Sequence, residues 1–241
     1  MGQEVTEPIP AAIARIAPDG RPTPRQRRRI MIEMGLRRIN PGTFSPPEFL
    51  QRRTAMNPWP DLRPVLKEFP WAITGAVATR AYMPERMTRD VDILVRREDC
   101  RAVWKRFQAA GYSVAPVLDA PYFLARTPEG VQVGVMCADF PWVTQALADT
   151  RSEPAGYPVL ALPYLILMKL KANRGIDIGD MTRMLGLASK SELDEVRDIV
   201  SRFAPEDSDD LQGLILLCEM EFRERQVPGS PAGVVEEEPE N

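Results

Sequence analysis

The stretch Trp71-Ala72-Ile73-Thr74-Gly75-Ala76-Val77-Ala78 joins a short apolar run to a helix-forming run through a single glycine. The next apolar segment, Asp90-Val91-Asp92-Ile93-Leu94-Val95, first alternates polar and apolar residues and then becomes fully apolar, which is typical of a strand buried at one end. Residues two apart on a strand point to the same face, so we expect Asp90 and Asp92 to project side by side, roughly 6–7 Å apart along the backbone. These two segments decide the expected fold, because they place a glycine turn and a carboxylate pair in strand, helix, strand order.

The same two segments indicate a chemistry. Two carboxylates on one face suit Mg²⁺, with Mn²⁺ as the alternative, because such ions prefer oxygen ligands and are commonly held by one or two carboxylates together with substrate phosphates. A glycine placed directly between a strand and a helix lets the backbone approach a phosphate, and the first N–H groups of the helix supply donors. An isolated Asp-x-Asp is more often structural, so it is the combination with Gly75 that favours a nucleotide site.

The surrounding segments predict an α/β (α+β) fold, with a small mixed β-sheet, flanking helices and a C-terminal helical bundle. We expect residues 1–23 to be a flexible lead-in, 24–69 to hold N-terminal helices, 70–150 to form the core, 151–227 to be helical and 228–241 to be a disordered acidic tail. The expected elements are helices beginning at Pro24, at the capping box Ser45-Pro46-Pro47-Glu48 and over Asp61–Phe69, strand Trp71–Thr74, helix Ala76–Tyr82, a strand from Asp90, helix Glu98–Ala110, a hairpin of Tyr122–Arg126 and Val131–Cys137, and helices Pro163–Arg174, Ile178–Leu187, Ser191–Phe203 and Asp209–Arg225.

Composition limits the classes of protein that need to be considered. Hydrophobic residues make up 44% of the chain and charged residues 27%, which are ordinary globular values. The longest apolar run, Val159 to Met168, is interrupted by Pro163 and is far shorter than the roughly 20 residues of a membrane span. Because the first residues also lack an apolar signal-peptide core, we expect a soluble cytoplasmic protein with no membrane partner.

Histidine and cysteine limit the chemistry further. The chain has no histidine, which excludes Ser-His-Asp and Cys-His catalysis and every His-ligated metal site. Its three cysteines, Cys100, Cys137 and Cys218, are widely scattered, so we expect buried thiols and neither a disulfide framework nor a zinc site. The net charge of −3 argues against bulk attraction to nucleic acid but leaves room for a local basic patch.

Two stretches together carry a resemblance to a known family. Thr74 to Ala78 and Arg86 to Val95 resemble the signature of the DNA polymerase beta nucleotidyltransferase superfamily. Within it, the sequence is most similar to the AbiEii-type nucleotidyltransferases, many of which are toxins of bacterial toxin–antitoxin systems. Leu165 to Arg174, with Asp177 and Asp180, resembles that group's helical motif of lysine, arginine and paired aspartates, so the likeness covers roughly Trp71 to Leu187.

The resemblance implies an enzyme that transfers a nucleoside monophosphate from an NTP to the hydroxyl of an RNA (tRNA) or a protein and releases pyrophosphate. It implies a cognate antitoxin as a further partner. Catalysis and metal binding are assigned to Asp90 and Asp92, which would hold Mg²⁺ against the triphosphate. The implied nucleotide-binding residues are Thr74, Gly75 and Ala76 at the glycine turn, Arg86 and Thr88 in the following loop, and Lys169 from the helical part as a point charge.

Departures from the family pattern keep a second interpretation open. The family usually has Gly-Ser or Gly-Gly at Gly75-Ala76, so a hydroxyl is missing that Thr74 or Thr79 would have to replace. The third carboxylate of the family, which activates the acceptor hydroxyl, corresponds here to Gly134, and Asp139 has the wrong offset to replace it. Without a general base, transfer would slow by about 10²- to 10⁴-fold. The alternative is therefore a silent nucleotide-binding or partner-binding module of the same fold.

Two charged sets also have a purely structural interpretation. The residues Lys169, Arg174, Asp177 and Asp180 could form a salt-bridge set rather than a triphosphate site. The basic helix that begins at Pro24 could contact RNA phosphates, although such runs usually form a solvated face. In that helix the basic residues are Arg27, Arg28, Arg29, Arg37 and Arg38.

Overall fold

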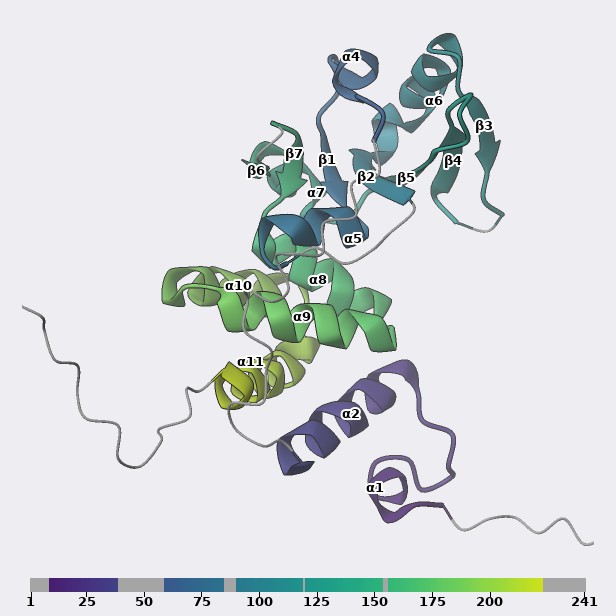
Figure 1. Ribbon diagram of the computed structural model, residues 1–241. Helices are drawn as coiled ribbons and strands as arrows, with labels where there is room; N and C mark the ends of the chain where they lie inside the picture. The colour runs from purple at the N-terminus through teal and green to yellow at the C-terminus, as the bar shows by residue number, and fades with distance from the viewer. Residues whose placement is uncertain (1–8, 39–58, 85–89, 119, 154–155, 223–241) are drawn as a thin grey trace, which may run out of the picture.

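A computed structural model describes residues 9–38, 59–84, 90–118, 120–153 and 156–222 (Figure 1). The expected helix at Ser45, the loop residues Arg86 and Thr88, and the acidic tail lie outside these ranges. No helix within the described ranges is long and apolar enough to cross a membrane.

A seven-stranded mixed sheet forms one end of the molecule, which confirms the predicted α/β class. Its strand order is β3-β4-β5-β2-β1-β7-β6, so β2 lies at the centre, antiparallel to β1 and parallel to β5. The hairpin expected from Tyr122 to Cys137 is the antiparallel pair of β4 and β5. The strands are β1 (Trp71–Thr74), β2 (Asp90–Arg96), β3 (Ser113–Pro116), β4 (Tyr122–Arg126), β5 (Gln132–Ala138), β6 (Thr150–Ser152) and β7 (Pro158–Leu160).

The two faces of the sheet have different partners. On one face, Phe123 of β4 packs against α6 (Cys100–Ala109), with its ring centroid 5.0 Å from that of Trp104 and 6.1 Å from that of Phe107. Alternation along the strands turns Thr74, Asp92 and Gly134 to the other face. That second face meets α8 (Leu162–Ala172), since Thr74 Oγ1 lies 3.3 Å from Met168 Sδ.

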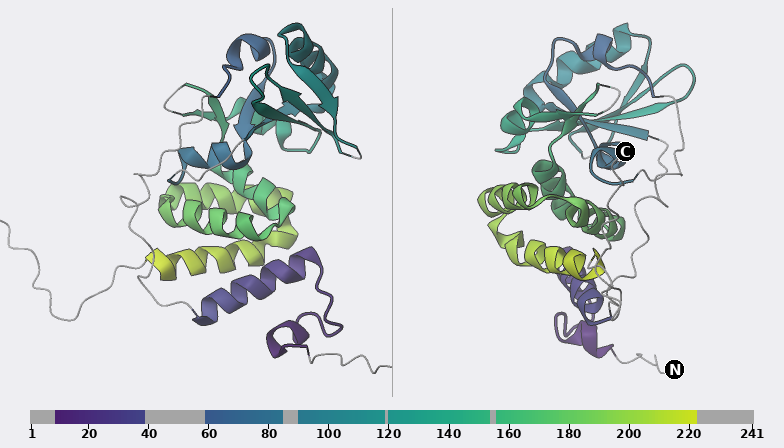
Figure 2. Two further views of the ribbon diagram at one scale, coloured as in Figure 1. Left: turned by 45° about the vertical axis from the view of Figure 1, so that its right-hand side comes forward. Right: turned by 60° about the vertical axis from the view of Figure 1, so that its left-hand side comes forward.

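The helices follow the sheet in layers (Figures 1 and 2). Below it lie α8, α9 (Gly175–Leu187) and α10 (Lys190–Phe203), then α11 (Ser208–Phe222), and then α2 (Pro24–Arg38), with α1 (Ala11–Ala14) beyond α2 at the far end. The other short helices are α4 (Arg63–Leu66), α5 (Gly75–Ala78) and α7 (Val143–Ala148). Strands β3, β6 and β7 were not expected, because their runs of three or four residues are too short to show a period in the sequence. Of these, β6 and β7 carry the sheet past residue 150.

Arg28 departs from the expected solvated face of the basic helix. Its side chain is only 1% exposed, and it donates hydrogen bonds to Asp210 (2.8 Å), Asp207 (2.7 Å) and the backbone oxygen of Leu170 (2.6 Å). These bonds connect α2 to α8 and to the start of α11. The reason is tertiary, since two acids far along the sequence supply partners for a guanidinium that could not otherwise be buried.

We expect Arg28→Ala to lower the free energy of unfolding by about 3–5 kcal/mol, because Asp210 would remain buried without its cation and Asp207 would keep only the more exposed Arg25 and Lys171. Urea titration followed by far-UV circular dichroism measures this. Arg29→Ala is the matched control, since the Arg29 side chain is 56% exposed and should cost less than about 1 kcal/mol. Equal losses in the two variants would contradict the buried role of Arg28.

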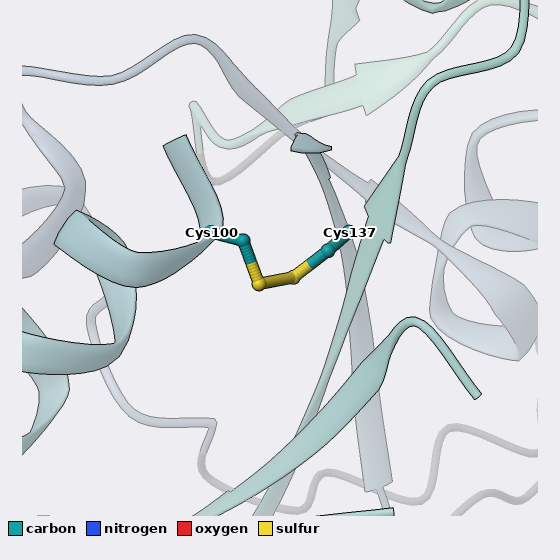
Figure 3. The surroundings of a disulfide bond; sticks show 2 residues. All are labelled: Cys100 and Cys137. Atoms are coloured by element: carbon teal, nitrogen blue, oxygen red, sulfur yellow. A yellow bond between two sulfur atoms is a disulfide. The ribbon is translucent and has the colours of Figure 1, made fainter. Parts of the chain in front are cut away.

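A disulfide joins Cys100 at the start of α6 to Cys137 in β5 (Figure 3). The prediction of buried thiols is therefore wrong for these two residues, whereas Cys218 is a buried free thiol. The two cysteines are 37 residues apart in sequence, but packing of α6 on the sheet brings their Cα atoms to 5.6 Å, within the range of a disulfide. Sequence spacing alone carries no such information.

Closing a loop of this length should stabilise the chain by about 4 kcal/mol in the chain-entropy account. We therefore expect dithiothreitol to lower the melting temperature measured by calorimetry. A double variant, Cys100→Ala with Cys137→Ala, should melt at a lower temperature than the wild type and be indifferent to the reductant. An unchanged wild-type melting temperature after complete reduction would contradict this.

Candidate nucleotide site

The centre of the sheet positions Asp92. Its Cα partner is Thr74 in β1 on one side and Gly134 in β5 on the other. Asp90 lies two residues earlier on the same face of β2, opposite Gln132. The alternation in the sequence therefore predicts the direction of both carboxylates, but only the sheet shows which neighbours they have.

Gly75 turns the chain from β1 into α5 directly against Asp92. Its φ of +66° is in the left-handed region that favours glycine. A Cβ at this position would lie 2.5 Å from Asp92 Oδ2, so any side chain would press on the carboxylate. The glycine turn and the acidic strand, quoted together in the sequence, are thus in contact in space.

Gly75→Ala should lower the free energy of unfolding by about 1–2 kcal/mol from the left-handed backbone alone, and it should displace Asp92. We expect NTP binding, measured by calorimetry with Mg²⁺ present, to weaken in the same variant. Gly179→Ala in α9 is the control, because no atom lies within 4 Å of its Cβ position and alanine favours a helix. A Gly75→Ala protein that matched wild type in both measurements would show that the turn does not need glycine.

A pocket of about 340 Å³ opens between this face of the sheet and α8. It contains the carboxylate of Asp92, the glycine turn and two cationic side chains. Asp90 is not among the residues that line it. The lining residues are Thr74, Gly75, Asp92, Tyr122, Met136, Leu165, Met168, Lys169, Ala172 and Arg174.

Tyr122 takes the place that the third carboxylate would occupy. Its hydroxyl donates a hydrogen bond of 2.7 Å to Asp92 Oδ1. A Cβ built on Gly134 would overlap this hydroxyl and also press on Asp92 Oδ1. The lack of a side chain at Gly134 therefore leaves room for the phenol of Tyr122, which comes from the neighbouring strand.

Lys169 and Arg174 both pair with Asp177 but differ in exposure. Lys169 is buried in α8, with Nζ 2.7 Å from Asp180 Oδ2 and 3.1 Å from Asp177 Oδ1, so the structure contains the salt-bridge set. Asn173, at φ 54°, ends α8 in the left-handed conformation and leads the chain into Arg174. The Arg174 side chain is 66% exposed and donates to Asp177 from Nε at 2.8 Å. Arg174 is thus the accessible cation of the pocket.

The expected substitutes for missing family groups lie elsewhere. The Thr79 hydroxyl is buried and donates to the backbone oxygen of Ala76 at 2.7 Å, so it does not face the pocket. The Thr74 hydroxyl lines the pocket but is directed to Met168. Asp139 lines a different depression, beside Arg96 and Arg97.

The electrostatics of the pocket follow from burial. Burial raises the pKa of Asp92, although the hydrogen bond from Tyr122 opposes the shift. Burial and the neighbouring Asp92 raise the pKa of Tyr122, so the phenol stays protonated. Burial would also raise the pKa of Asp177, but the hydrogen bond from Arg174 and the charge of Lys169 outweigh it and lower that pKa.

Asp90 and Asp92 are the residues that would hold a Mg²⁺ ion. They offer hard carboxylate oxygens on one face of β2. Within the described ranges no group of three or more aspartate, glutamate, cysteine or histidine residues lies close enough to hold a metal. A single ion would therefore need substrate phosphates and water for its remaining ligands.

Two polar residues of the pocket, Tyr122 and Arg174, were missing from the expected site. Tyr122 had been identified only as the first residue of a strand, and no signal in its own segment reveals that its hydroxyl crosses to β2. Arg174 was noted in the helical motif without a binding role. Gly134 was the one available signal for Tyr122, because a glycine inside a strand often marks a place where another group approaches closely.

Comparisons with known proteins give a likeness of fold only. No protein-family model and no curated protein matches the chain. The solution structure of the antibiotic-resistance factor ANT(2'')-Ia is 15% identical, covering 62% of this chain and 82% of its own, with a TM-score of 0.36. A Thermotoga maritima protein assigned as a nucleotidyltransferase is 16% identical over 54% of this chain and 88% of its own, with a TM-score of 0.36.

A crystal structure of ANT(2'')-Ia in complex with adenylyl-2''-tobramycin is 16% identical, covering 62% of this chain and 88% of its own, with a TM-score of 0.35. These three structures belong to two proteins, one described as an antibiotic-resistance factor and the other as a nucleotidyltransferase. Identities and TM-scores this low carry no functional argument, so the function has to follow from the side chains of the pocket.

Proposed function

We propose that this protein is a Mg²⁺-dependent nucleotidyltransferase that moves a nucleoside monophosphate from an NTP to an acceptor hydroxyl. The observation that carries the proposal is the meeting of Asp92, the Gly75 turn and Arg174 in one pocket. A carboxylate, an open backbone turn and an exposed guanidinium are the groups that a metal-bound triphosphate requires.

Each group has a separate task in this proposal. Asp92, together with Asp90 on the same face of β2, would hold Mg²⁺, which when bound neutralises charge on the phosphates. Gly75 and Ala76 would present backbone N–H groups to the β- and γ-phosphates, and Thr74 would line the base of the turn. Arg174 would bind a phosphate oxygen directly, while Lys169 would contribute its charge from the buried salt-bridge set. Arg86 and Thr88 keep their expected role in orienting the loop.

The acceptor belongs to the same proposal. The motif spacing from Lys169 to Asp180 favours an AbiEii-like toxin component acting on the hydroxyl of RNA (tRNA) or of a protein in the cytoplasm. A cognate antitoxin is the expected partner of such a protein. Its binding would be detectable as loss of transfer when the antitoxin is added.

A second candidate is a silent nucleotide-binding or partner-binding module. The Tyr122 hydroxyl favours it, because this group stands where the family places a base and is itself hydrogen-bonded to Asp92. This candidate predicts NTP binding with Mg²⁺ and no turnover with any acceptor. Robust transfer would eliminate it.

The test is to incubate the protein with each α-labelled NTP, Mg²⁺ or Mn²⁺, and either bulk tRNA or a protein extract. Asp92→Asn should reduce label transfer by about 10²-fold or more, because it removes the charged ligand of the metal. Asp139→Asn is the matched control, an acid outside the pocket that should leave transfer unchanged. Transfer that survives Asp92→Asn undiminished would contradict the proposal.

A further inference from the structure

The Tyr122 hydroxyl occupies an unusual position for a residue of a nucleotide pocket. It projects from β4 past Gly134 and ends 2.7 Å from Asp92 Oδ1. It lines the same pocket as the Gly75 turn and Arg174, where the triphosphate of the proposed function would lie. The chain therefore places a hydroxyl of its own in the pocket proposed for the NTP.

The other hydroxyl of the pocket is less suited to react. Thr74 is 1% exposed and its Oγ1 is directed to Met168 Sδ. Tyr122 instead donates to a carboxylate oxygen, which is the arrangement of a nucleophile with a proton acceptor within hydrogen-bond reach. Of these two groups, only Tyr122 has both access to the pocket and a place for its proton.

We propose that Tyr122 is a nucleotidyl acceptor, so that the protein modifies itself at this residue. The inference rests on the proposed function, since it uses the same NTP and the same pocket. It also names a protein tyrosine as one acceptor of that site.

The transfer step balances with the groups present. Tyr122 Oη attacks the α-phosphorus of the NTP, and the bond between this phosphorus and the bridging oxygen breaks. Pyrophosphate leaves with the electron pair of that bond, and the phenolic proton passes to Asp92 Oδ1. The product is a phosphodiester between Tyr122 and the nucleoside 5'-phosphate, which remains in the pocket and limits the reaction to one event per chain.

Intact mass spectrometry of the full chain, incubated with Mg²⁺ and ATP, GTP, CTP or UTP in turn, tests this. The expected result is a mass gain of one nucleoside monophosphate with at least one of the four nucleotides. Trypsin should place it on the peptide of residues 107–126, and fragmentation should assign it to Tyr122 rather than to Tyr112 in the same peptide.

Three variants make the result specific. Tyr122→Phe should abolish the mass gain, and Asp92→Asn should slow it by about 10²-fold while the phenol is still present. Tyr157→Phe is the matched control, a tyrosine outside this pocket that should leave the modification unchanged. Circular dichroism of each variant verifies that loss of modification is not loss of folding.

Calorimetry of NTP binding to the wild-type protein separates the two proposals. NTP binding without any mass gain would overturn self-modification and leave the proposed nucleotide site intact. A mass gain at another residue, or one that persists in Tyr122→Phe, would also overturn it. No NTP binding at all would contradict the proposed function together with this inference.

Discussion

The carboxylate of Asp92 lies between two glycines, and the remainder of the site is built around this close packing. Its Oδ2 lies 2.5 Å from the position of a Cβ on Gly75, and its Oδ1 is next to the position of a Cβ on Gly134. A side chain at either glycine would displace the acid. Close packing of the strands thus keeps a carboxylate in a half-buried position, where its negative charge needs a partner.

The partners that the structure supplies to Asp92 differ from those of a complete two-metal site. On the sheet side the partner is the Tyr122 hydroxyl, a neutral donor that takes the space of an acid. On the helical side Arg174 lines the same pocket, with its guanidinium held by Asp177. In the proposed function, the acid and the accessible cation would hold a metal-bound triphosphate, and the phenol would be the acceptor of the proposed self-modification.

The helical layers hold this cation in place. Lys169 and Asp177 pair within the buried interface of α8 and α9, which fixes the start of α9 where Arg174 emerges. Farther from the sheet, Arg28 donates to the backbone oxygen of Leu170, one residue after Lys169. The helix α2 is therefore bound to α8 through Arg28, and its basic character is partly a structural requirement.

The sequence by itself determined most of the elements and the direction of the acids. Alternation of polar and apolar residues predicted the face of Asp90 and Asp92, and Gly75 predicted the turn. Apolar periodicity predicted the hairpin and most of the helices. All of these signals are local in the sequence. Only the tertiary structure decided the contacts between segments far apart in the chain. The Cys100–Cys137 bond, the burial of Arg28 and the Tyr122 hydroxyl opposite Gly134 each depend on how one element packs on another. Such packing is set by shape and by buried charge, which leave no periodic trace in the sequence.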